Sequence, residues 1–327
     1  MTEKIGVVIH NWRMDDLLAP EDRARLAELG QVRWADSDDE LSTEEAVDLL
    51  QGCRVGIGSW QTPWPNGELL DACPELRLWV HVAGSVKYMF GPHLDGRDLD
   101  IISCHDAIAE YVAEMTVGLV LLGLRHYFRN ALRNRTEKRP GEPPRTTYGS
   151  TVGIVGASCV GRWVVRYLEP YPCKMVCYDP FLSEQGAAEL GVQKVEDLTD
   201  LCSRSDVVSL HTPALPETAK MMGAEQFQAM PDDGVFINTA RGMCVDEDAL
   251  ITELRKGRLT AYLDVTDPEP AAEDSPLRSL PNCYVTSHIA GPPDPRMGAY
   301  AVDQVAAWLQ GGRPEGLITA NMIERMA

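Results

Sequence analysis

The chain has 327 residues, of which 44% are hydrophobic and 24% are charged, a composition typical of a globular protein with two domains. Its 30 basic and 49 acidic residues give a net charge of −19, which repels nucleic-acid phosphates, so no nucleic-acid partner is predicted. The longest apolar stretch, residues 115–124, is about half the length of a membrane span, which needs roughly 20 residues, so no membrane segment is predicted.

In the first third of the chain, short apolar runs alternate with helix-length segments that carry one apolar face. Helices that cover both faces of a parallel sheet leave its strands as continuous apolar runs. This order therefore predicts a doubly wound α/β domain. The predicted strands are residues 4–10, 54–58, 76–82 and 100–103, and residues 19–29 are predicted as one of the helices between them.

A long helix is predicted over residues 108–129, with Asp106 as its N-cap, followed by a charged, proline-rich surface loop over residues 135–145. The alternation of strands and helices then resumes, and a final helix over residues 297–309 is expected to return to the first domain. The sequence thus predicts two α/β domains with a linker near residues 104–108. The strands of the second domain are expected at residues 151–155, 174–178, 207–210, 234–238, 261–265 and 284–287.

A glycine turn between a strand and a helix marks a candidate dinucleotide site. Gly156 and Gly161 occupy the first and last positions of the fingerprint, and Ser158 replaces its middle glycine. Asp179 follows the next strand, where an acid accepts the ribose hydroxyls of NAD and repels the 2′-phosphate of NADP. The free N–H groups at the start of the helix suit a pyrophosphate, and the Ser158 hydroxyl is a further donor. The sequence therefore predicts an NAD site, to which Cys159 and Val160 also belong.

Three later side chains supply the chemistry that reduction of a 2-keto acid requires. An arginine binds carboxylate or carbonyl oxygens with two parallel hydrogen bonds, and a histidine exchanges protons near neutral pH. A carboxylate beside the histidine orients the ring and favours its protonated form. Arg241, His288 and Glu269 each follow an apolar strand, at the edge where open α/β sheets bind their ligands.

The segments NTARG (238–242), VDEDAL (245–250), LDVTDPEP (263–270) and TSHIAG (286–291) resemble the D-isomer-specific 2-hydroxyacid dehydrogenase family, and the likeness extends over nearly the whole chain. It implies a flavodoxin-like substrate domain over residues 1–105 and 293–327 and a Rossmann NAD-binding domain over residues 106–292. It also implies that Arg241 binds and polarises the substrate, that Glu269 pairs with His288, and that His288 is the general acid–base.

The resemblance implies further contacts in both domains. Backbone N–H groups of Gly84 and Ser85 are expected to hold the substrate carboxylate. Lys87 stands where the family usually has an acidic or amide residue, and it is either solvated or within reach of a second anionic group. His211 either lines the adenosine side or only shapes its turn. The other expected cofactor contacts are Thr212, Pro213, Thr239, Ala240, Asp264 and Gly291, together with Arg241 and His288.

The predicted function is hydride transfer between NAD(H) and a small 2-hydroxy or 2-keto acid of the glyoxylate, hydroxypyruvate or pyruvate type. Two alternatives stay open, an NAD(H)-sensing protein similar to corepressors that resemble this family and a phosphite-type dehydrogenase. The nine cysteines form no CxxC pair, which predicts no metal site and indicates reduced thiols in a cytoplasmic protein. Residues 117–124 are more apolar than one domain face needs, which predicts a homodimer.

Overall fold

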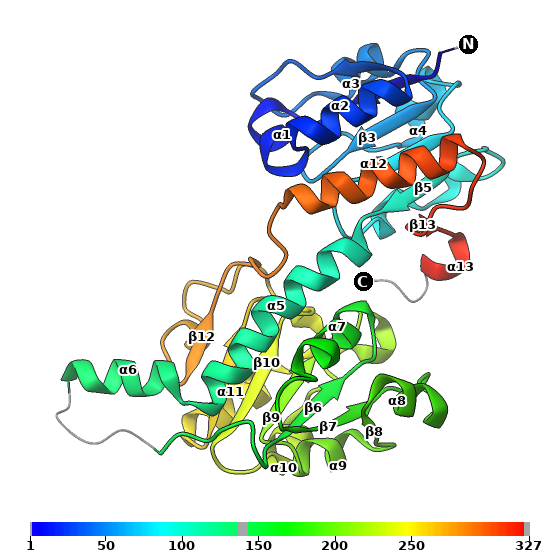
Figure 1. Ribbon diagram of the computed structural model, residues 1–327. Helices are drawn as coiled ribbons and strands as arrows, with labels where there is room; N and C mark the ends of the chain where they lie inside the picture. Colours follow the sequence, from blue (N-terminus) through cyan, green and yellow to red (C-terminus); the bar gives the residue numbers. More distant parts are fainter. Residues whose placement is uncertain (1, 137–142, 324–327) are drawn as a thin grey trace. The chain divides into compact units, whose positions relative to one another are not determined.

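The chain folds into two compact α/β units, in a computed structural model that describes residues 2–136 and 143–323. The first unit comprises Met1–Ile108 and Pro292–Met326, and the second comprises Ala109–Gly291. Each unit is built on a parallel sheet with helices packed against it (Figure 1). The predicted fold class of two doubly wound domains is confirmed.

The sheet of the first unit has the flavodoxin-like strand order β2-β1-β3-β4-β5, and all five strands are parallel. A short strand, β13 (Leu317–Ile318), pairs antiparallel with β5 at one edge. The strand order reverses between β1 and β3, so the connections that leave these two strands diverge. The parallel strands are β1 (Lys4–Val7), β2 (Gln31–Trp34), β3 (Val55–Gly58), β4 (Leu78–His81) and β5 (Asp100–Ser103).

Burial explains which strands of this sheet were predictable. Every residue of β3 and β4 is buried, because helices cover the sheet, and both strands are continuous apolar runs. In contrast, β2 is only partly buried and carries Arg33 between two apolar residues, so no strand was predicted there. The helices of the first unit are α1 (Asn11–Leu17), α2 (Pro20–Leu29), α3 (Thr43–Leu50), α4 (Gly67–Ala72), α12 (Pro295–Leu309) and α13 (Ala320–Ile323), with short 3-10 helices η1 (Lys87–Met89) and η2 (Pro92–Leu94).

The helix α12 packs within the first unit although it comes near the end of the chain. It contacts α1, α2 and β4. A Cβ atom on Gly298 would lie 2.0 Å from the carbonyl oxygen of Leu17, so only glycine permits this close approach. The segment that begins at Pro292 is therefore held to the rest of the first unit by the direct packing of α12.

The sheet of the second unit has the order β8-β7-β6-β9-β10-β11-β12, with all strands parallel. Its order reverses between β6 and β9, as in a Rossmann fold. The strands are β6 (Thr151–Val155), β7 (Lys174–Tyr178), β8 (Gln193–Lys194), β9 (Val207–Leu210), β10 (Gly234–Asn238), β11 (Leu259–Leu263) and β12 (Cys283–Val285). The helices are α5 (His105–Leu124), α6 (Tyr127–Thr136), α7 (Cys159–Leu168), α8 (Glu184–Leu190), α9 (Leu198–Ser203), α10 (Ala224–Ala229) and α11 (Glu247–Arg255), with 3-10 helices η3 (Pro216–Thr218), η4 (Gly242–Cys244) and η5 (Pro276–Arg278).

The predicted continuous helix over residues 108–129 is wrong, because the chain forms two helices there. His126 adopts a left-handed φ of 48°, which ends α5. The carbonyl of Leu124 accepts a hydrogen bond from the backbone N–H of Arg145 (2.8 Å) instead of from a further helical turn. Asp106 is not the N-cap either, since α5 already begins at His105. Residues 137–142 of the predicted surface loop lie outside the described residues, and α6 extends as far as Thr136.

Among the described helices, α5 alone is long and apolar enough by composition to span a membrane, with a mean hydropathy of 1.7 over 18 residues. The apolar stretch considered in the sequence analysis, residues 115–124, is only the second half of this helix. Half of that window is buried inside the structure. Its buried residues, which include Val117 and Val120, belong to the same apolar core as residues of β6, β9 and β10. Packing against the sheet therefore accounts for the buried half of the apolar residues of α5.

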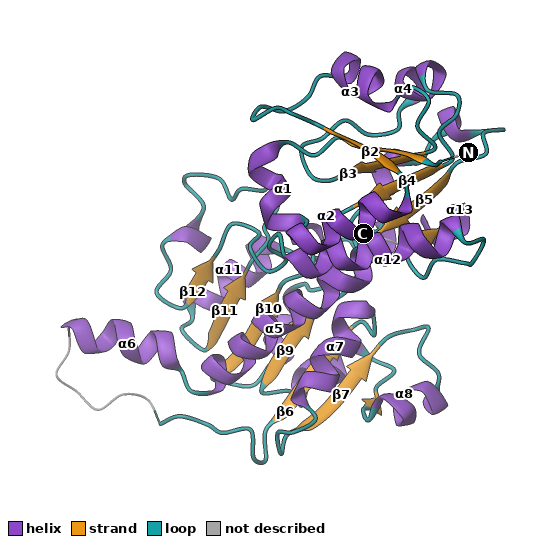
Figure 2. Cartoon of the chain, turned by 45° about the horizontal axis from the view of Figure 1, so that its top comes forward, coloured by secondary structure: helices purple, strands orange, loops and turns teal. Residues whose placement is uncertain are grey.

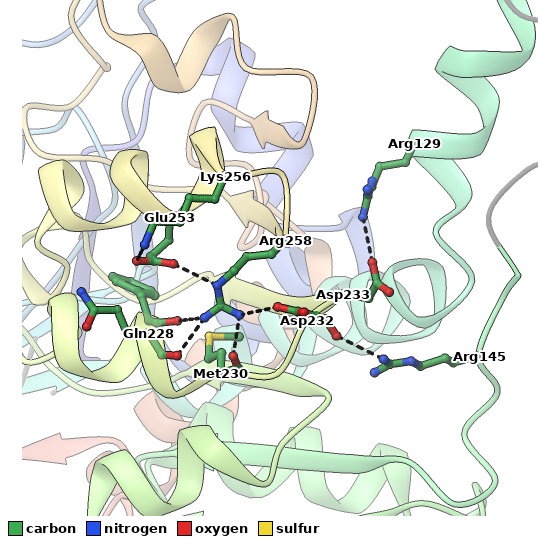
Figure 3. A network of polar contacts seen from close by, with 10 residues as sticks. Arg129, Arg145, Gln228, Met230, Asp232, Asp233, Glu253, Lys256 and Arg258 are labelled. Carbon is green, nitrogen blue, oxygen red and sulfur yellow. Dashed lines mark hydrogen bonds and ion pairs between the residues drawn. The ribbon is translucent and has the colours of Figure 1, made fainter.

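Arg258 joins the ends of two helices on one side of the second sheet (Figure 3). Its Nη2 donates to the carbonyls of Phe227 (2.8 Å) and Gln228 (2.9 Å), at the end of α10. Its Nε donates to the carboxylate of Glu253 on α11 (3.0 Å), which is almost fully buried and also accepts a hydrogen bond from Lys256 (2.6 Å). Burial alone would raise the pKa of Glu253, but the hydrogen bonds from Lys256 and Arg258 hold it below its usual value.

We expect Arg258→Gln to lower the free energy of unfolding by about 3 kcal/mol at neutral pH, because the buried Glu253 carboxylate loses one of its two cationic partners. Urea denaturation followed by circular dichroism measures this difference. Because the folded-state pKa of Glu253 is lowered, the stabilisation is present above the unfolded-state pKa and is lost as the pH falls through the folded-state pKa. The difference between the variant and wild type is therefore expected to shrink in acid.

The matched control is Arg204→Gln, which removes a largely exposed arginine paired with Asp200. Exposed pairs contribute little to stability, so this variant is expected to unfold close to wild type. Equal denaturation midpoints for the two variants would contradict the role given to Arg258.

Candidate active site

The glycine turn lies at the reversal point of the second sheet, between β6 and α7. Gly156 has a φ of 99°, and a Cβ atom there would lie 3.0 Å from the backbone of His211, which follows β9. A Cβ atom on Gly161 would lie 2.2 Å from the carbonyl oxygen of Gly156, so this second glycine lets the helix pack tightly on its strand. Both positions therefore require glycine for space, and Gly156 also requires it for its backbone conformation.

Ser158 fits the middle position of the turn without strain. Its φ of −66° and ψ of 177° are ordinary for a residue with a side chain. The residue is the N-cap of α7, and its hydroxyl oxygen accepts a hydrogen bond from the backbone N–H of Gly161 (3.4 Å). The serine that stands in place of the middle glycine thus caps the helix with its side chain. The next two predicted contacts, Cys159 and Val160, are exposed and partly exposed in the first turn of α7.

Asp179 ties the end of β7 to the glycine turn. One carboxylate oxygen accepts a hydrogen bond from the N–H of Ala157 (2.8 Å), and the other accepts one from the N–H of Phe181 (2.8 Å). Each oxygen of a carboxylate accepts two hydrogen bonds, so this half-buried group keeps acceptor capacity for hydroxyl groups. Together with the Gly156 turn, this carboxylate fits the ribose and pyrophosphate of a dinucleotide.

The loop after β9 packs beside this turn. His211 is only 3% exposed, its Nε2 lies 2.9 Å from the hydroxyl of Ser209, and burial lowers its pKa to about 3. The ring is therefore neutral and faces the interior of the unit. Thr212 and Pro213 are partly exposed, and the carbonyl of Pro213 accepts a hydrogen bond from Thr218 (2.5 Å).

The loop after β10 is held by the buried side chain of Asn238. Its amide nitrogen donates to the carbonyl of Arg241 (3.0 Å), and its oxygen accepts a hydrogen bond from the N–H of Ala240 (3.0 Å). The hydroxyl of Thr239 lies 2.9 Å from that of Thr116 on α5. The backbone from residue 239 to residue 241 is thus fixed by contacts from inside the same unit.

Arg241 is half-buried next to the loop that carries Glu269. Burial lowers the pKa of Arg241, and the negative charge of Glu269 opposes this effect. Its Nη1 donates to the carbonyl of Ala240 (2.6 Å). The guanidinium is therefore positioned near a carboxylate without forming an ion pair that would occupy its whole hydrogen-bonding edge.

His288 and Glu269 form the pair that the sequence suggested. Nδ1 of His288 lies 2.6 Å from Oε1 of Glu269, and both side chains are partly exposed. His288 has a φ of 55°, which is uncommon for a residue with a side chain and is maintained only where neighbours enforce it. Because Nδ1 faces the carboxylate, Nε2 is the ring nitrogen left to exchange a proton with a ligand.

Asp264 supplies the contacts that hold this loop. Its carboxylate is 1% exposed and accepts hydrogen bonds from the hydroxyl of Thr286 (2.6 Å) and from the N–H groups of Ile289 (2.8 Å) and Ala290 (2.8 Å). The carbonyl of Asp264 accepts a fourth from the N–H of His288 (2.8 Å). The carboxylate of Asp264 is thus directed at residues 286–290. Gly291 comes directly after this loop.

A pocket of about 670 Å³ adjoins the pair and is lined in part by apolar side chains. Its wall consists of Thr266, Glu269, Pro270, Ala271, Arg278, Val285, Thr286, Ser287 and Ile289. Glu269 thus has the pocket on one side, and its Oε1 faces His288.

The predicted substrate loop belongs to the first unit, after β4. The carbonyls of Ala83 and Gly84 accept hydrogen bonds from the hydroxyl of Ser103 at the end of β5. Gly84 and Ser85 are partly exposed, and the N–H of Gly84 has no acceptor in the described part of the chain. Lys87 is partly exposed in η1.

Several supporting residues were not assigned from sequence. Asn238 lies in the NTARG segment and Glu247 in the VDEDAL segment, but residue type alone did not reveal that they hold loops. Oε1 of Glu247 accepts a hydrogen bond from the N–H of Asp267 (2.8 Å), and burial raises the pKa of this glutamate. Thr116 lies inside an apolar helix, and no sequence signal indicates its contact with Thr239.

Comparison with known proteins agrees with this geometry. The family model described as the NAD binding domain of D-isomer specific 2-hydroxyacid dehydrogenases matches residues 117–290, all within the second unit. D-3-phosphoglycerate dehydrogenase of Methanocaldococcus jannaschii is 31% identical over 303 residues, covering 90% of this chain and 56% of that protein. The chain thus spans about half the length of this relative and of the D-3-phosphoglycerate dehydrogenase of Mycobacterium bovis.

Two further comparisons extend over most or all of the length of the matched proteins. Glyoxylate reductase of Korarchaeum cryptofilum is 29% identical over 293 residues, which covers 86% of this chain and 88% of that protein. The NAD-complexed D-isomer specific 2-hydroxyacid dehydrogenase of Lactobacillus delbrueckii has the same fold, with a TM-score of 0.79, 23% identity and coverage of 97% and 100%. The match of the family model to more than half of the chain shows that the chain belongs to the D-isomer specific 2-hydroxyacid dehydrogenase family and contains its NAD-binding domain.

Proposed function

We propose that this protein interconverts a small D-2-hydroxy acid and the corresponding 2-keto acid, of the glyoxylate, hydroxypyruvate or pyruvate type. The observation that carries the proposal is the 2.6 Å contact between Nδ1 of His288 and Oε1 of Glu269. Arg241 lies close enough to Glu269 for the negative charge of this carboxylate to affect its pKa. The names of the two relatives, a phosphoglycerate dehydrogenase and a glyoxylate reductase, agree with a 2-hydroxy acid substrate. In this proposal the first unit binds the substrate and the second binds NAD.

Bound NAD(H) supplies or accepts the hydride. In the direction of reduction, Nε2 of His288 donates a proton to the carbonyl oxygen, and Glu269 stabilises the protonated ring through Nδ1. Arg241 stabilises the negative charge that develops on that oxygen. The N–H groups of Gly84 and Ser85 hold the substrate carboxylate. The other cofactor-site residues proposed from sequence provide the walls of the NAD site, and Asp179 favours NAD over NADP.

The direct test is an absorbance assay with a panel of 2-keto acids, with NADH and NADPH in parallel. We expect Arg241→Ala to lower kcat by about 100- to 1,000-fold, because a donor to the developing oxyanion is lost. Arg255→Ala, at an exposed position of α11, is the control and is expected to keep wild-type activity. Wild-type turnover by the Arg241 variant would refute this role. NADH binding without turnover of any keto acid would instead favour a sensor.

The pH dependence tests the proton carrier. Because reduction consumes a proton from His288, kcat/KM for reduction is expected to fall as the pH rises, and that for oxidation to rise. His288→Gln is expected to lower both and to remove this dependence. Glu269→Gln is expected to lower kcat/KM in both directions, since the His288 ring loses the carboxylate that orients it through Nδ1. Wild-type kcat/KM for Glu269→Gln in both directions would contradict the pairing.

We further propose that the protein acts as a homodimer in the cytoplasm. All nine cysteines are free thiols, which suits a reducing compartment. The helix α6 lies at the edge of the second unit, with its far end directed away from the sheet (Figure 2). It exposes Tyr127 (55%) and Leu132 (40%), apolar surface that a second copy would cover.

We expect wild type to sediment as a dimer at micromolar concentration and the double variant Tyr127→Asp, Leu132→Asp to sediment as a monomer. Phe181→Asp, at a residue that is 77% exposed elsewhere in the second unit, is the control and is expected to stay dimeric. A monomeric wild type would refute the dimer.

A further inference from the structure

Arg13 lies where the strand order of the first sheet reverses. The residue belongs to α1, which follows β1, and its Nη2 donates to Oε1 of Gln61 in the loop after β3 (3.2 Å). Strands β1 and β3 are parallel neighbours, and the chain leaves them in opposite directions along the sheet. Open α/β sheets bind ligands in the crevice outside the carboxyl ends of two such strands. The hydrogen bond between Arg13 and Gln61 therefore crosses the position at which this type of sheet binds its ligands.

Two tryptophan rings lie close to the guanidinium. Its central carbon lies over both rings, 4.4 Å from the ring centre of Trp12 and 5.9 Å from that of Trp60. Such cation–π contacts are made with the aromatic faces and do not use up the N–H donors, which stay available for a carboxylate or a phosphate. The arginine is therefore pre-oriented as an anion receptor.

Arg13 has no acidic partner in the described part of the chain, although the protein has a net charge of −19. Its neighbours Arg23 and Arg25 pair with Asp15 and Asp303. The Nε of Arg13 is buried and has no hydrogen-bond acceptor. An unused buried donor on a cation is costly unless a ligand satisfies it.

The ring nitrogens of His10, the residue before α1, also lack hydrogen-bond partners in the described structure. Its side chain is fully buried. Burial and the charge of Arg13 lower the pKa of His10, while Glu40 opposes them. A neutral ring keeps one N–H donor, so the start of α1 contains two buried donors without an acceptor among the described residues, one on the His10 ring and the other the Nε of Arg13.

Gln61 is held in a strained conformation that directs it to Arg13. Its φ is 59°, in the left-handed region. The flanking turn is fixed by the hydroxyl of Thr62, which accepts from the N–H of Ser59 (2.8 Å) and donates to its carbonyl (2.8 Å). Residues held in this region without being glycine cost free energy, and they cluster at ligand sites.

The same turn connects this cluster to the loop that carries Gly84 and Ser85. The hydroxyl of Ser59 donates to the carbonyl of Val82 (2.8 Å), two residues before Gly84. Strands β1 and β4 are separated by β3 alone, so their ends lie about 10 Å apart. A short acid with a charged group at each end, together with the long side chain of Arg13, is of a suitable size for this span.

We infer that Arg13, oriented by Trp12, Trp60 and Gln61, binds a second anionic group of the substrate, a carboxylate or a phosphate remote from the carboxylate held by Gly84 and Ser85. The inference rests on the proposed function and extends its substrates to 2-keto or 2-hydroxy acids that carry a second anionic group, in addition to the singly anionic glyoxylate, hydroxypyruvate and pyruvate type. Arg13 is a specificity-determining residue in this reading and takes no part in proton transfer.

Matched pairs of substrates test the inference on the wild-type protein. 2-Oxoglutarate is compared with 2-oxopentanoate for the carboxylate, and phosphohydroxypyruvate is compared with hydroxypyruvate for the phosphate. We expect kcat/KM to be about 10- to 100-fold higher for the doubly anionic member of at least one pair, the range for one charge-assisted hydrogen bond. The pair that shows the preference identifies the anion.

Substitutions then assign the preference to Arg13. Arg13→Gln is expected to reduce the ratio of kcat/KM within that pair about 10- to 100-fold, mainly through KM for the doubly anionic acid. Gln61→Glu is expected to reduce the same ratio, because the new carboxylate would pair with Arg13 and neutralise its charge. This second variant tests the role of Arg13 even if Arg13→Gln does not fold. Arg23→Gln, which removes an arginine of the same unit that already pairs with Asp15, is the matched control and is expected to keep the wild-type ratio.

The outcomes separate this inference from the proposed function. If no acid in the panel oxidises NADH, the proposed function fails. If singly anionic acids are reduced but neither doubly anionic acid is preferred, or if the preference survives both substitutions, the function stands and the role of Arg13 is overturned.

Discussion

The buried carboxylate of Asp264 anchors the loop of the second unit that carries His288. Asp264 accepts three hydrogen bonds from residues 286, 289 and 290 with its side chain and one from His288 with its carbonyl. A buried charge is tolerated only when such donors surround it, so the loop and the carboxylate require each other. These contacts enforce the positive φ of His288 and thereby present its ring to Glu269.

Electrostatics and burial give the proposed catalytic groups different roles. Burial works against the positive charge of Arg241, and Glu269 partly compensates for it. The same carboxylate bonds Nδ1 of His288. A single acid thus lies near both the guanidinium and the imidazole, which is suited to the proposed site, where negative charge develops on a substrate oxygen and a proton arrives from the histidine. His211, in contrast, is kept neutral by burial and serves the packing behind the glycine turn.

Both sheets place functional side chains where their strand order reverses. In the second unit, Gly156 after β6 contacts the backbone of His211 after β9. In the first unit, Arg13 after β1 bonds Gln61 after β3. The reason is topological, since connections that diverge from two neighbouring parallel strands leave space between them that side chains or ligands fill. One unit fills this space around a glycine turn suited to phosphates, and the other lines it with a guanidinium that lies over two tryptophan rings.

The amino-acid sequence alone determined the elements whose signals are local. Continuous apolar runs identified the buried strands, and the glycine spacing identified the turn at Gly156. The residue types at 241, 269 and 288 indicated the chemistry that we propose. Only the tertiary structure decided the break at His126, the capping role of Ser158, the function of Asp264 as a loop anchor and the meeting of Arg13 with Gln61. Apart from the Ser158 cap, which is a local contact with Gly161, these features depend on contacts between segments farther apart in the chain, and neither periodicity nor residue type records which distant segment a side chain will reach.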